Sequence, residues 1–241
     1  MKSWMSANKL KLNDDKTEAI LCGSDSNLRK VDIPSIKVGA SDIILANTVR
    51  DLGFIIDNKL TIASHISTVV RACSFHLRAL GQLRPLIDKQ TANAIAVAII
   101  QSRRDYCNSC LWGVPKNQLE RLQKVQNTAA RFVSGVKKYD HISELHWLPV
   151  TKRIDHKILS LAYECVDGTA PSYLREIVPK HVPLRMLRSS TQSFLRVPRL
   201  DGHRKKTLGV RSFESVSLSL WNSLPETLKK TLRLKNSARK I

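Results

Sequence analysis

Acidic residues are scarce in this chain, and no long apolar stretch runs through it. Its 241 residues include 20 Asp and Glu against 40 Lys and Arg, which leaves a formal net charge of +20. The longest apolar run, Ala94 to Ile100, is far shorter than the roughly 18 residues of a membrane-spanning helix. No charged segment followed by an apolar one opens the sequence, so we expect an intracellular protein, cytoplasmic or nuclear, without a membrane partner.

The same charge balance favours a polyanionic partner. A charge of +20 opposes compaction through self-repulsion, and contact with phosphates relieves that repulsion. The sequence lacks a strong basic amphipathic helix with aromatic anchors, which favours nucleic acid over a membrane surface. The hydrophobic content of 42% permits a packed core, and the five cysteines, an odd number, are expected to be reduced thiols.

The first 60 residues alternate helical and extended patterns. Apolar residues within 4–12 suit the end of a helix, the polar triplet 13–15 breaks it, and the apolar run 19–22 suits a strand. Three later strands are expected, and they cover 36–38, 43–45 and 54–56. Gly53 precedes the last of these strands and would let another backbone approach closely.

From Ile62 onward, apolar residues recur at helical spacing. Asp88 is expected to cap the second of three amphipathic helices, and Gly81 and Gly135 lie just past the first and third. These helices cover 62–80, 89–104 and 115–134, and the last carries an apolar stripe of Leu119, Leu122, Val125, Ala129 and Phe132. A later helix ends near Val166. The fold class is therefore α+β and mostly helical, with a small β part before a helical bundle.

Five blocks of the sequence, in their order, resemble the reverse transcriptases of non-LTR (LINE-type, jockey-like) retrotransposons. The first is W-M-x-x-N-x-L-x-L-N-x-x-K-T-E at 4–18, and the second is VRDLGFIID at 49–57, similar to the family's primer-grip segment. The other three blocks are YCNSCLWG at 106–113, LHWLPV at 145–150 and WNSLP at 221–225.

The resemblance implies a palm remnant over 1–60, a thumb-like bundle over 61–137 and a basic post-thumb region over 138–241. The family's catalytic Tyr/Phe-x-Asp-Asp loop should lie upstream of Met1, so the isolated chain is expected to be no enzyme. It should need no cofactor of its own, because Mg²⁺ serves only the intact polymerase. The expected partners are an RNA–DNA duplex, held by its phosphate backbone, and the upstream catalytic part of the same polyprotein.

Some positions depart from the family pattern. Arg104 and Cys110 stand where relatives carry leucine, and the stretch after Pro225 lacks the usual Phe- and Leu-containing end. Two alternatives to a polymerase fragment therefore stay open. One is a non-catalytic, basic nucleic-acid-binding protein, and the other is a decayed, non-functional relic of a mobile element.

Cations near these blocks are the candidate nucleic-acid contacts. Lys16 takes the family position of a lysine near the incoming triphosphate, although a solvated lysine in a turn would look the same. The helix from Lys116 to Lys138 has a single acid, Glu120, and the proline-punctuated stretch 180–211 has nine Lys and Arg against Asp201. The predicted contacts are Lys11, Lys16, Arg50, Gly53, Arg121, Lys124, Arg131, Lys137, Lys138, Arg196, Arg199, Arg204, Lys205 and Lys206.

Catalytic and metal sites are expected to be absent. Asp14, Asp15 and Asp57 are interpreted as turn and cap residues, because a two-metal site needs carboxylates that converge on ions about 4 Å apart. Cys107 and Cys110 with His141 and His146 permit a zinc site, but the spacer between the pairs is about twice the usual 12–15 residues. Packing cysteines are the favoured interpretation. Trp112, Trp147 and Trp221 are expected in the core rather than as base-stacking platforms.

Overall fold

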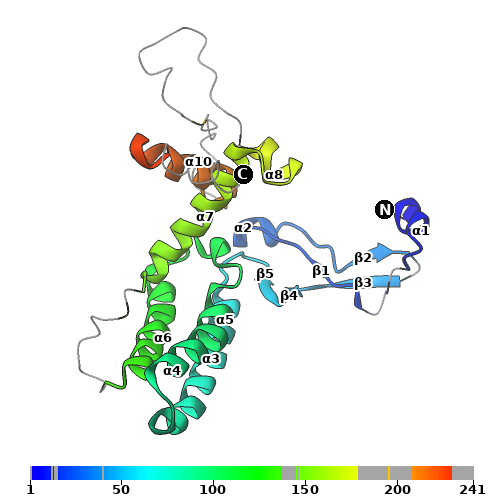
Figure 1. Cartoon of the computed structure of the whole chain (residues 1–241). Coiled ribbons are helices and arrows are strands. Elements are labelled where there is room, and N and C mark those ends of the chain that lie inside the picture. The colour runs from blue at the N-terminus through cyan, green and yellow to red at the C-terminus, as the bar shows by residue number, and fades with distance from the viewer. Residues whose placement is uncertain are drawn as a thin grey trace. The chain divides into compact units, whose positions relative to one another are not determined.

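The chain divides into two units in its computed structural model. Unit 1 comprises Met1–Arg104 and Val114–Ile142, and unit 2 comprises Asp105–Gly113 and Ser143–Ile241. The structure describes residues 2–11, 13, 16–39, 41–136, 145, 147–178, 195 and 208–229. These residues form a mostly helical α+β fold with two small sheets, as the sequence predicts (Figure 1). The segments 1–60 and 61–137, expected as separate parts, both contribute to unit 1.

The first sheet of unit 1 has three short strands in the order β1-β3-β2. β1 (Ala19–Ile20) runs parallel to β3 (Ser41–Ala46), which pairs antiparallel with β2 (Ser35–Val38). The strands expected over 36–38 and 43–45 lie within β2 and β3, and Ile36 is opposite Ile43. β3 begins earlier than expected, because Ser41 and Asp42 pair with Val38 and Lys37. Short helices precede two of the strands, α1 (Lys2–Ala7) before β1 and α2 (Asp25–Leu28) before β2.

A β-hairpin forms the second sheet. β4 (Thr48–Asp51) pairs antiparallel with β5 (Phe54–Asp57), and the Asp51–Phe54 pair leaves Leu52 and Gly53 as a two-residue turn. Both turn residues have positive φ, 46° for Leu52 and 91° for Gly53. Two-residue hairpin turns need positive φ, and glycine adopts it without steric cost. The prediction that Gly53 admits a close backbone was wrong, because a Cβ placed there would meet nothing within 4 Å. The glycine serves the turn.

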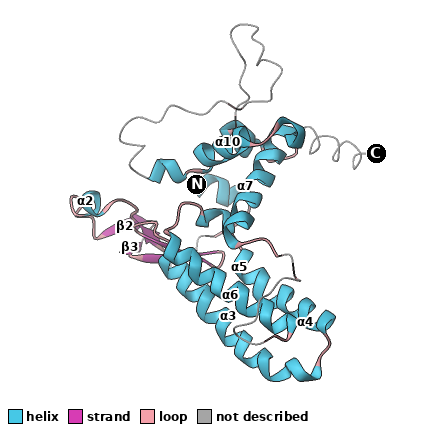
Figure 2. Ribbon diagram, turned by 90° about the vertical axis from the view of Figure 1, so that its left-hand side faces the viewer, coloured by secondary structure: helices cyan, strands magenta, loops and turns pink. Residues whose placement is uncertain are grey.

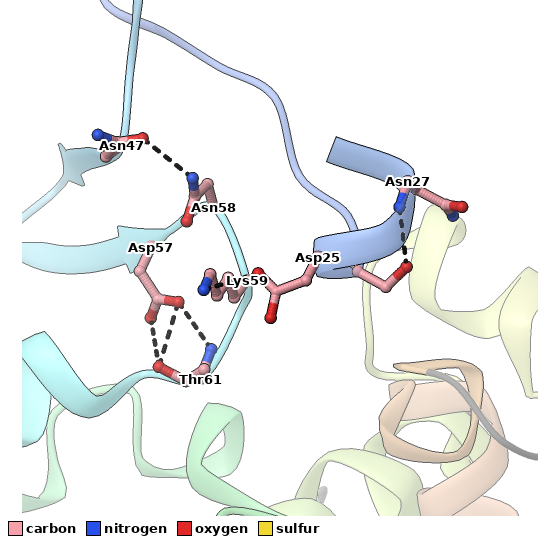
Figure 3. Close-up of polar contacts among 8 residues, drawn as sticks. Asp25, Asn27, Asn47, Asp57, Asn58, Lys59 and Thr61 are labelled. Carbon is pink, nitrogen blue, oxygen red and sulfur yellow. Dashed lines mark hydrogen bonds and ion pairs between the residues drawn. The ribbon is translucent and has the colours of Figure 1, made fainter. Parts of the chain in front are cut away.

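The hairpin leads into the bundle through a capped turn (Figure 3). The buried carboxylate of Asp57 accepts hydrogen bonds from the backbone N–H of Thr61 at 2.9 Å and from that of Ile62 at 2.6 Å. Thr61 Oγ1 lies 3.2 Å from both carboxylate oxygens. Asp57 therefore satisfies donors that precede α3, and its interpretation as a cap residue is confirmed.

Three helical segments build the bundle of unit 1, and they are seen in two views (Figure 1, Figure 2). α3 (Ala63–Leu83) packs against α6 (Lys116–Ser134), and both contact the middle segment. That segment consists of α4 (Lys89–Ile95), the π-helical η3 (Ala96–Gln101) and α5 (Ser102–Asp105). Asp88 caps α4 by accepting from the N–H of Thr91 at 2.9 Å, as predicted. α3 does not end at Gly81 but continues to Leu83, where η2 (Arg84–Leu86) follows.

The helix cores follow the predicted apolar stripes. Ile66, Cys73, Leu77 and Leu80 of α3 are buried, and so are Leu122, Val125, Ala129 and Phe132 of α6. Leu119 is only half-buried. α6 ends where Gly135 adopts φ of 71° and its N–H bonds to the carbonyl of Arg131 at 2.9 Å, which is a left-handed C-terminal cap.

Unit 2 has its own core. α7 (Val150–Asp167) ends before Gly168, close to the predicted end near Val166, and α8 (Ser172–Ile177) follows Pro171. η6 (Leu208–Arg211) precedes α10 (Phe213–Ser223), which packs on α7 through Tyr163, Leu218 and Trp221. η4 (Asn108–Leu111) contacts α7 as well. Trp221 is buried as predicted, whereas Trp112 and Trp147 are half-buried.

None of the helices within the described ranges has the length and apolar character needed to cross a membrane.

Candidate functional site

A groove runs along the seam between α3 and α6 in unit 1. Two adjoining hollows, of about 750 Å³ and 380 Å³, share Leu77, Lys124 and Thr128 and so form one continuous depression. We call this depression the α3–α6 groove. Its lining residues are Val70, Ser74, Leu77, Arg78, Gly81, Arg84, Arg121, Lys124, Val125, Asn127, Thr128, Arg131, Phe132, Gly135 and Val136.

The floor of the groove is apolar. Leu77 from α3 and Val125 and Phe132 from α6 are at most 9% exposed, because these side chains form the contact between the two helices. Helical spacing explains the arrangement, because Arg78, Lys124 and Arg131 are each adjacent in sequence to one of these floor residues. Adjacent residues are turned by about 100° around a helix and so come to lie at the edges of the contact. The packing of the core therefore determines which side chains lie at the edges of the groove.

The edges of the groove are strongly basic. Five of the lining residues carry a positive charge, and none of the described lining residues is acidic. The cations are Arg78, Arg84, Arg121, Lys124 and Arg131. Glu120 is the single acid of α6, and it lies outside the lining, 4.0 Å from Lys116 at the start of the helix. The groove is therefore a concentration of positive charge above an apolar floor.

Arg84 holds one end of the groove together. Its Nε donates to the carbonyl oxygen of Phe132 at 2.6 Å and its Nη2 to that of Val133 at 3.1 Å. Its Nη1 donates to the carbonyl oxygen of Ile87 at 2.9 Å. The last carbonyls of a helix have no partner within the helix, so Arg84 satisfies two of them at the end of α6. These three acceptors are neutral, and the positive charge of Arg84 also helps to lower the pKa of the Asp88 carboxyl.

Arg121 is also held by neutral groups. Its Nη1 donates to Ser67 Oγ at 3.1 Å and to Gln118 Oε1 at 2.8 Å, which ties α6 to α3. Arg131 is half-buried, and its Nε finds no hydrogen-bond acceptor among the described residues. Arg78 and Lys124 are exposed. The five cations therefore differ in exposure, and none of them forms an ion pair within 4.0 Å with a carboxylate of the described residues.

Such a surface suits the backbone of a nucleic acid. Arginine and lysine donors bind phosphate oxygens, and contacts of this kind position a protein on a nucleic acid without selecting a sequence. Arg121 and Arg131 are ten residues apart on α6, which corresponds to about 15 Å along the helix axis. One strand has a phosphate about every 3.4 Å of duplex axis, so the groove is long enough to contact several phosphates.

The structure brings together three of the predicted contact residues. Arg121, Lys124 and Arg131 lie off the buried stripe of α6 and line the same groove. Four others are described but do not line it, namely Lys11, Lys16, Arg50 and Gly53, all exposed in unit 1. The remaining seven lie outside the described residues, namely Lys137, Lys138, Arg196, Arg199, Arg204, Lys205 and Lys206.

Sequence reasoning missed Arg78 and Arg84. The apolar spacing of α3 predicts which face of the helix is buried, but it does not predict where its arginines cluster. A usable signal was present, because the 21 residues of α3 contain arginine and no Asp or Glu. A long helix without acids beside a second basic helix is a pattern that indicates a shared basic surface.

The cysteine and aspartate predictions have mixed outcomes. Cys107 and Cys110 are both exposed, so the interpretation as packing cysteines was wrong for this pair. His141, His146, Asp14 and Asp15 lie outside the described residues. Across the part of the chain that the structure describes, no three His, Cys, Asp or Glu side chains are grouped so that they could hold a metal ion.

Comparison with known proteins finds no matching family model, no similar curated protein and no similar solved structure.

Proposed function

We propose that this chain binds nucleic acid by its phosphate backbone, with the α3–α6 groove as the principal contact. The observation that carries the proposal is the groove lining, in which five cations and no described acid surround an apolar floor. Long-range attraction by the +20 charge would raise the rate of encounter with a polyanion, and the groove would supply the directed contacts. Recognition should be independent of base sequence.

We further propose that the chain is the C-terminal, thumb-containing part of a non-LTR retrotransposon reverse transcriptase. The support is the resemblance of five ordered sequence blocks, together with a helical bundle that follows two small sheets in unit 1. In an intact polymerase, the groove would hold the primer–template duplex beside the catalytic part. A coding sequence upstream of Met1 that contains Tyr/Phe-x-Asp-Asp in frame would strengthen this assignment.

The test of binding is its dependence on salt. Each phosphate contact releases condensed counterions, so log K should fall against log salt with a slope of about −0.9 per contact on a duplex. With about five contacts, a fourfold to fivefold rise in salt should weaken binding roughly a thousandfold. Fluorescence anisotropy with an RNA–DNA duplex of two unrelated sequences measures both the slope and the sequence independence.

A double variant locates the contact. Arg78→Gln with Lys124→Gln removes two exposed groove cations, one from each helix, and should flatten the slope by about 1.8. The matched control is Arg71→Gln with Lys30→Gln, which removes the same charge from exposed positions of unit 1 outside the lining. Equal slopes in the two double variants would show that net charge, and not the groove, determines binding.

A primer-extension assay separates a binder from an enzyme. We expect no template-dependent incorporation by the isolated chain with Mg²⁺ or Mn²⁺, because its sequence lacks a Tyr/Phe-x-Asp-Asp motif. Binding without incorporation would agree with both the polymerase-fragment and the non-catalytic-binder hypotheses. Incorporation above a buffer blank would contradict the proposal that the chain has no catalytic centre.

A further inference from the structure

Two cysteines of unit 2 share one tight turn. Cys107 directly precedes η4, and Cys110 is the third residue of that 3₁₀ helix. The backbone N–H of Cys110 donates to the carbonyl of Cys107 at 3.0 Å, which closes a four-residue turn. The first and fourth Cα atoms of a turn lie less than about 7 Å apart, and a disulfide spans Cα distances of about 4.4–6.8 Å. The backbone thus brings the two thiols within reach of each other.

The residues around the pair are anchored, while the cysteines themselves are exposed. Asn108 and Leu111 are buried, at 7% and 3% exposure, and Asp105 pairs with Arg153 of α7 through two guanidinium nitrogens. On the other side, Arg211 Nε donates to the carbonyl of Trp112 at 3.2 Å. The turn is therefore held at both ends, and both Cys107 and Cys110 remain accessible to reagents in solution.

The electrostatic surroundings agree with this proximity. Desolvation by neighbouring atoms raises the pKa of the Cys110 thiol, and a negative charge on Cys107 raises it further. The raised pKa disfavours the thiolate of Cys110, so we assign the first attack on a disulfide to Cys107.

We propose that Cys107 and Cys110 form a redox-active dithiol that low-molecular-weight disulfides, of the glutathione class, convert to an intramolecular disulfide. Cys107 loses its proton to solvent, and its thiolate attacks one sulfur of the small disulfide. That S–S bond breaks and releases one thiol, which leaves a mixed disulfide on Cys107. Cys110 then loses its proton to solvent, and its thiolate attacks Cys107 Sγ. The second small thiolate is released and takes up a proton. Two protein thiols are thereby oxidised, and one small disulfide is reduced to two thiols.

The test uses the full chain in buffers of graded reduced and oxidised glutathione, followed by an acid quench, alkylation and mass spectrometry. Trypsin releases 105–116 as one peptide that contains both cysteines, and 17–29 as a peptide that contains only the exposed Cys22. Cys22 is thus an internal reference for a single accessible thiol. We expect the 105–116 peptide to lose two hydrogens at an oxidised-glutathione concentration about tenfold below that at which Cys22 becomes glutathionylated, because ring closure is intramolecular.

Serine variants assign the roles. In Cys110→Ser, Cys107 cannot close the ring and should accumulate the mixed disulfide with glutathione. In Cys107→Ser, Cys110 should react more slowly than Cys107 does in the other variant. Circular dichroism checks that each exposed substitution preserves the fold. The proposal is overturned if the wild-type peptide carries two glutathiones, forms disulfides between chains, or stays fully reduced in buffers that glutathionylate Cys22.

Discussion

Unit 2 and the α3–α6 groove of unit 1 differ in the groups that contact their positive charges. In unit 2, several described cations meet carboxylates. Arg153 pairs with Asp105, Lys152 lies 3.7 Å from Asp155, and Lys229 lies 3.7 Å from Glu226. In the α3–α6 groove of unit 1, the arginine donors with described partners instead contact carbonyl, hydroxyl and amide oxygens.

This difference has a physical consequence. An ion pair cancels most of the field of a cation, whereas a neutral acceptor orients the cation and leaves its charge available to a ligand. An excess of positive charge over a whole chain thus says little about the location of a binding surface. The cations that line a groove without forming an ion pair are more informative about that location, and in unit 1 they lie on α3, η2 and α6.

The largest expected effect tests whether the core of unit 1 supports the groove. Leu122 is 1% exposed between α6 and its neighbours, so Leu122→Asp would bury a carboxylate without a partner and cost several kcal/mol of folding free energy. Lys124→Asp, two residues on and exposed, should leave the helical signal intact. Circular dichroism with urea titration measures both. Equal losses in the two variants would show that the faces of α6 are assigned wrongly.

A second variant asks whether unit 2 contributes to binding. Trp221 is fully buried against α7, and Trp221→Ala should cost about 3–5 kcal/mol of stability in that core. If the groove alone contacts nucleic acid, the salt slope should stay within error of wild type at temperatures where unit 1 remains folded. A slope that is shallower by about 0.9 or more, which corresponds to the loss of at least one phosphate contact, would show that unit 2 forms part of the interface.

The third prediction compares Arg84 and Arg78, and it tests whether Arg84 mainly stabilises the fold while Arg78 mainly contributes to binding. Arg84→Met leaves the carbonyls of Phe132 and Val133 without their donor and should lower the free energy of unfolding by about 2 kcal/mol. Arg78→Met should change stability by less than about 0.5 kcal/mol but flatten the salt slope by about 0.9. Thermal melts of both variants measure the change in stability, and fluorescence anisotropy measures the change in salt slope. Similar melting temperatures would show that the contacts of Arg84 add little to stability.

Much of the helical structure follows from the sequence, because local pattern determines it. The apolar spacing of α3, α6 and α7 and the carboxylate of Asp88 act over a few residues, and each was predicted near its observed place. β4 was not predicted, because its four residues, Thr48–Asp51, include a single apolar side chain and gain their order by pairing with β5. The π-helical η3 was missed because residues 94–100 are almost uniformly apolar and show no change of period.

The candidate site could be predicted only in part, because some of its residues meet only through packing between distant segments. The α6 cations were found from their own helix, whose single acid makes the charge obvious. Arg84 reaches Phe132 across 48 positions of sequence, and only the packing of two helices brings them together. Helix pairing depends on the shape of the whole core, which a pattern within one segment does not encode.

The smallest expected effect concerns the first turn of α3, before the groove begins. His65 is 5% exposed, its ring lies 4.1 Å from that of Phe54, and its Nδ1 accepts a hydrogen bond from the N–H of Ile55 at 3.4 Å. Burial lowers the pKa of His65, and the positive charge of Arg50 lowers it further. The folded protein therefore favours the neutral imidazole, whose Nδ1 can accept the hydrogen bond from the N–H of Ile55.

Because the folded-state pKa lies below the unfolded value of about 6.5, the unfolded chain binds the proton more readily. The stabilisation by neutral His65 should be complete above about pH 6.5 and should decline as the pH falls below it, by at most about 1.4 kcal/mol per pH unit. His65→Asn keeps an acceptor near Nδ1 but does not titrate. Urea unfolding of both proteins between pH 7.5 and pH 5 should show a wild-type decline that exceeds that of the variant, and parallel curves would exclude His65 as the titrating group.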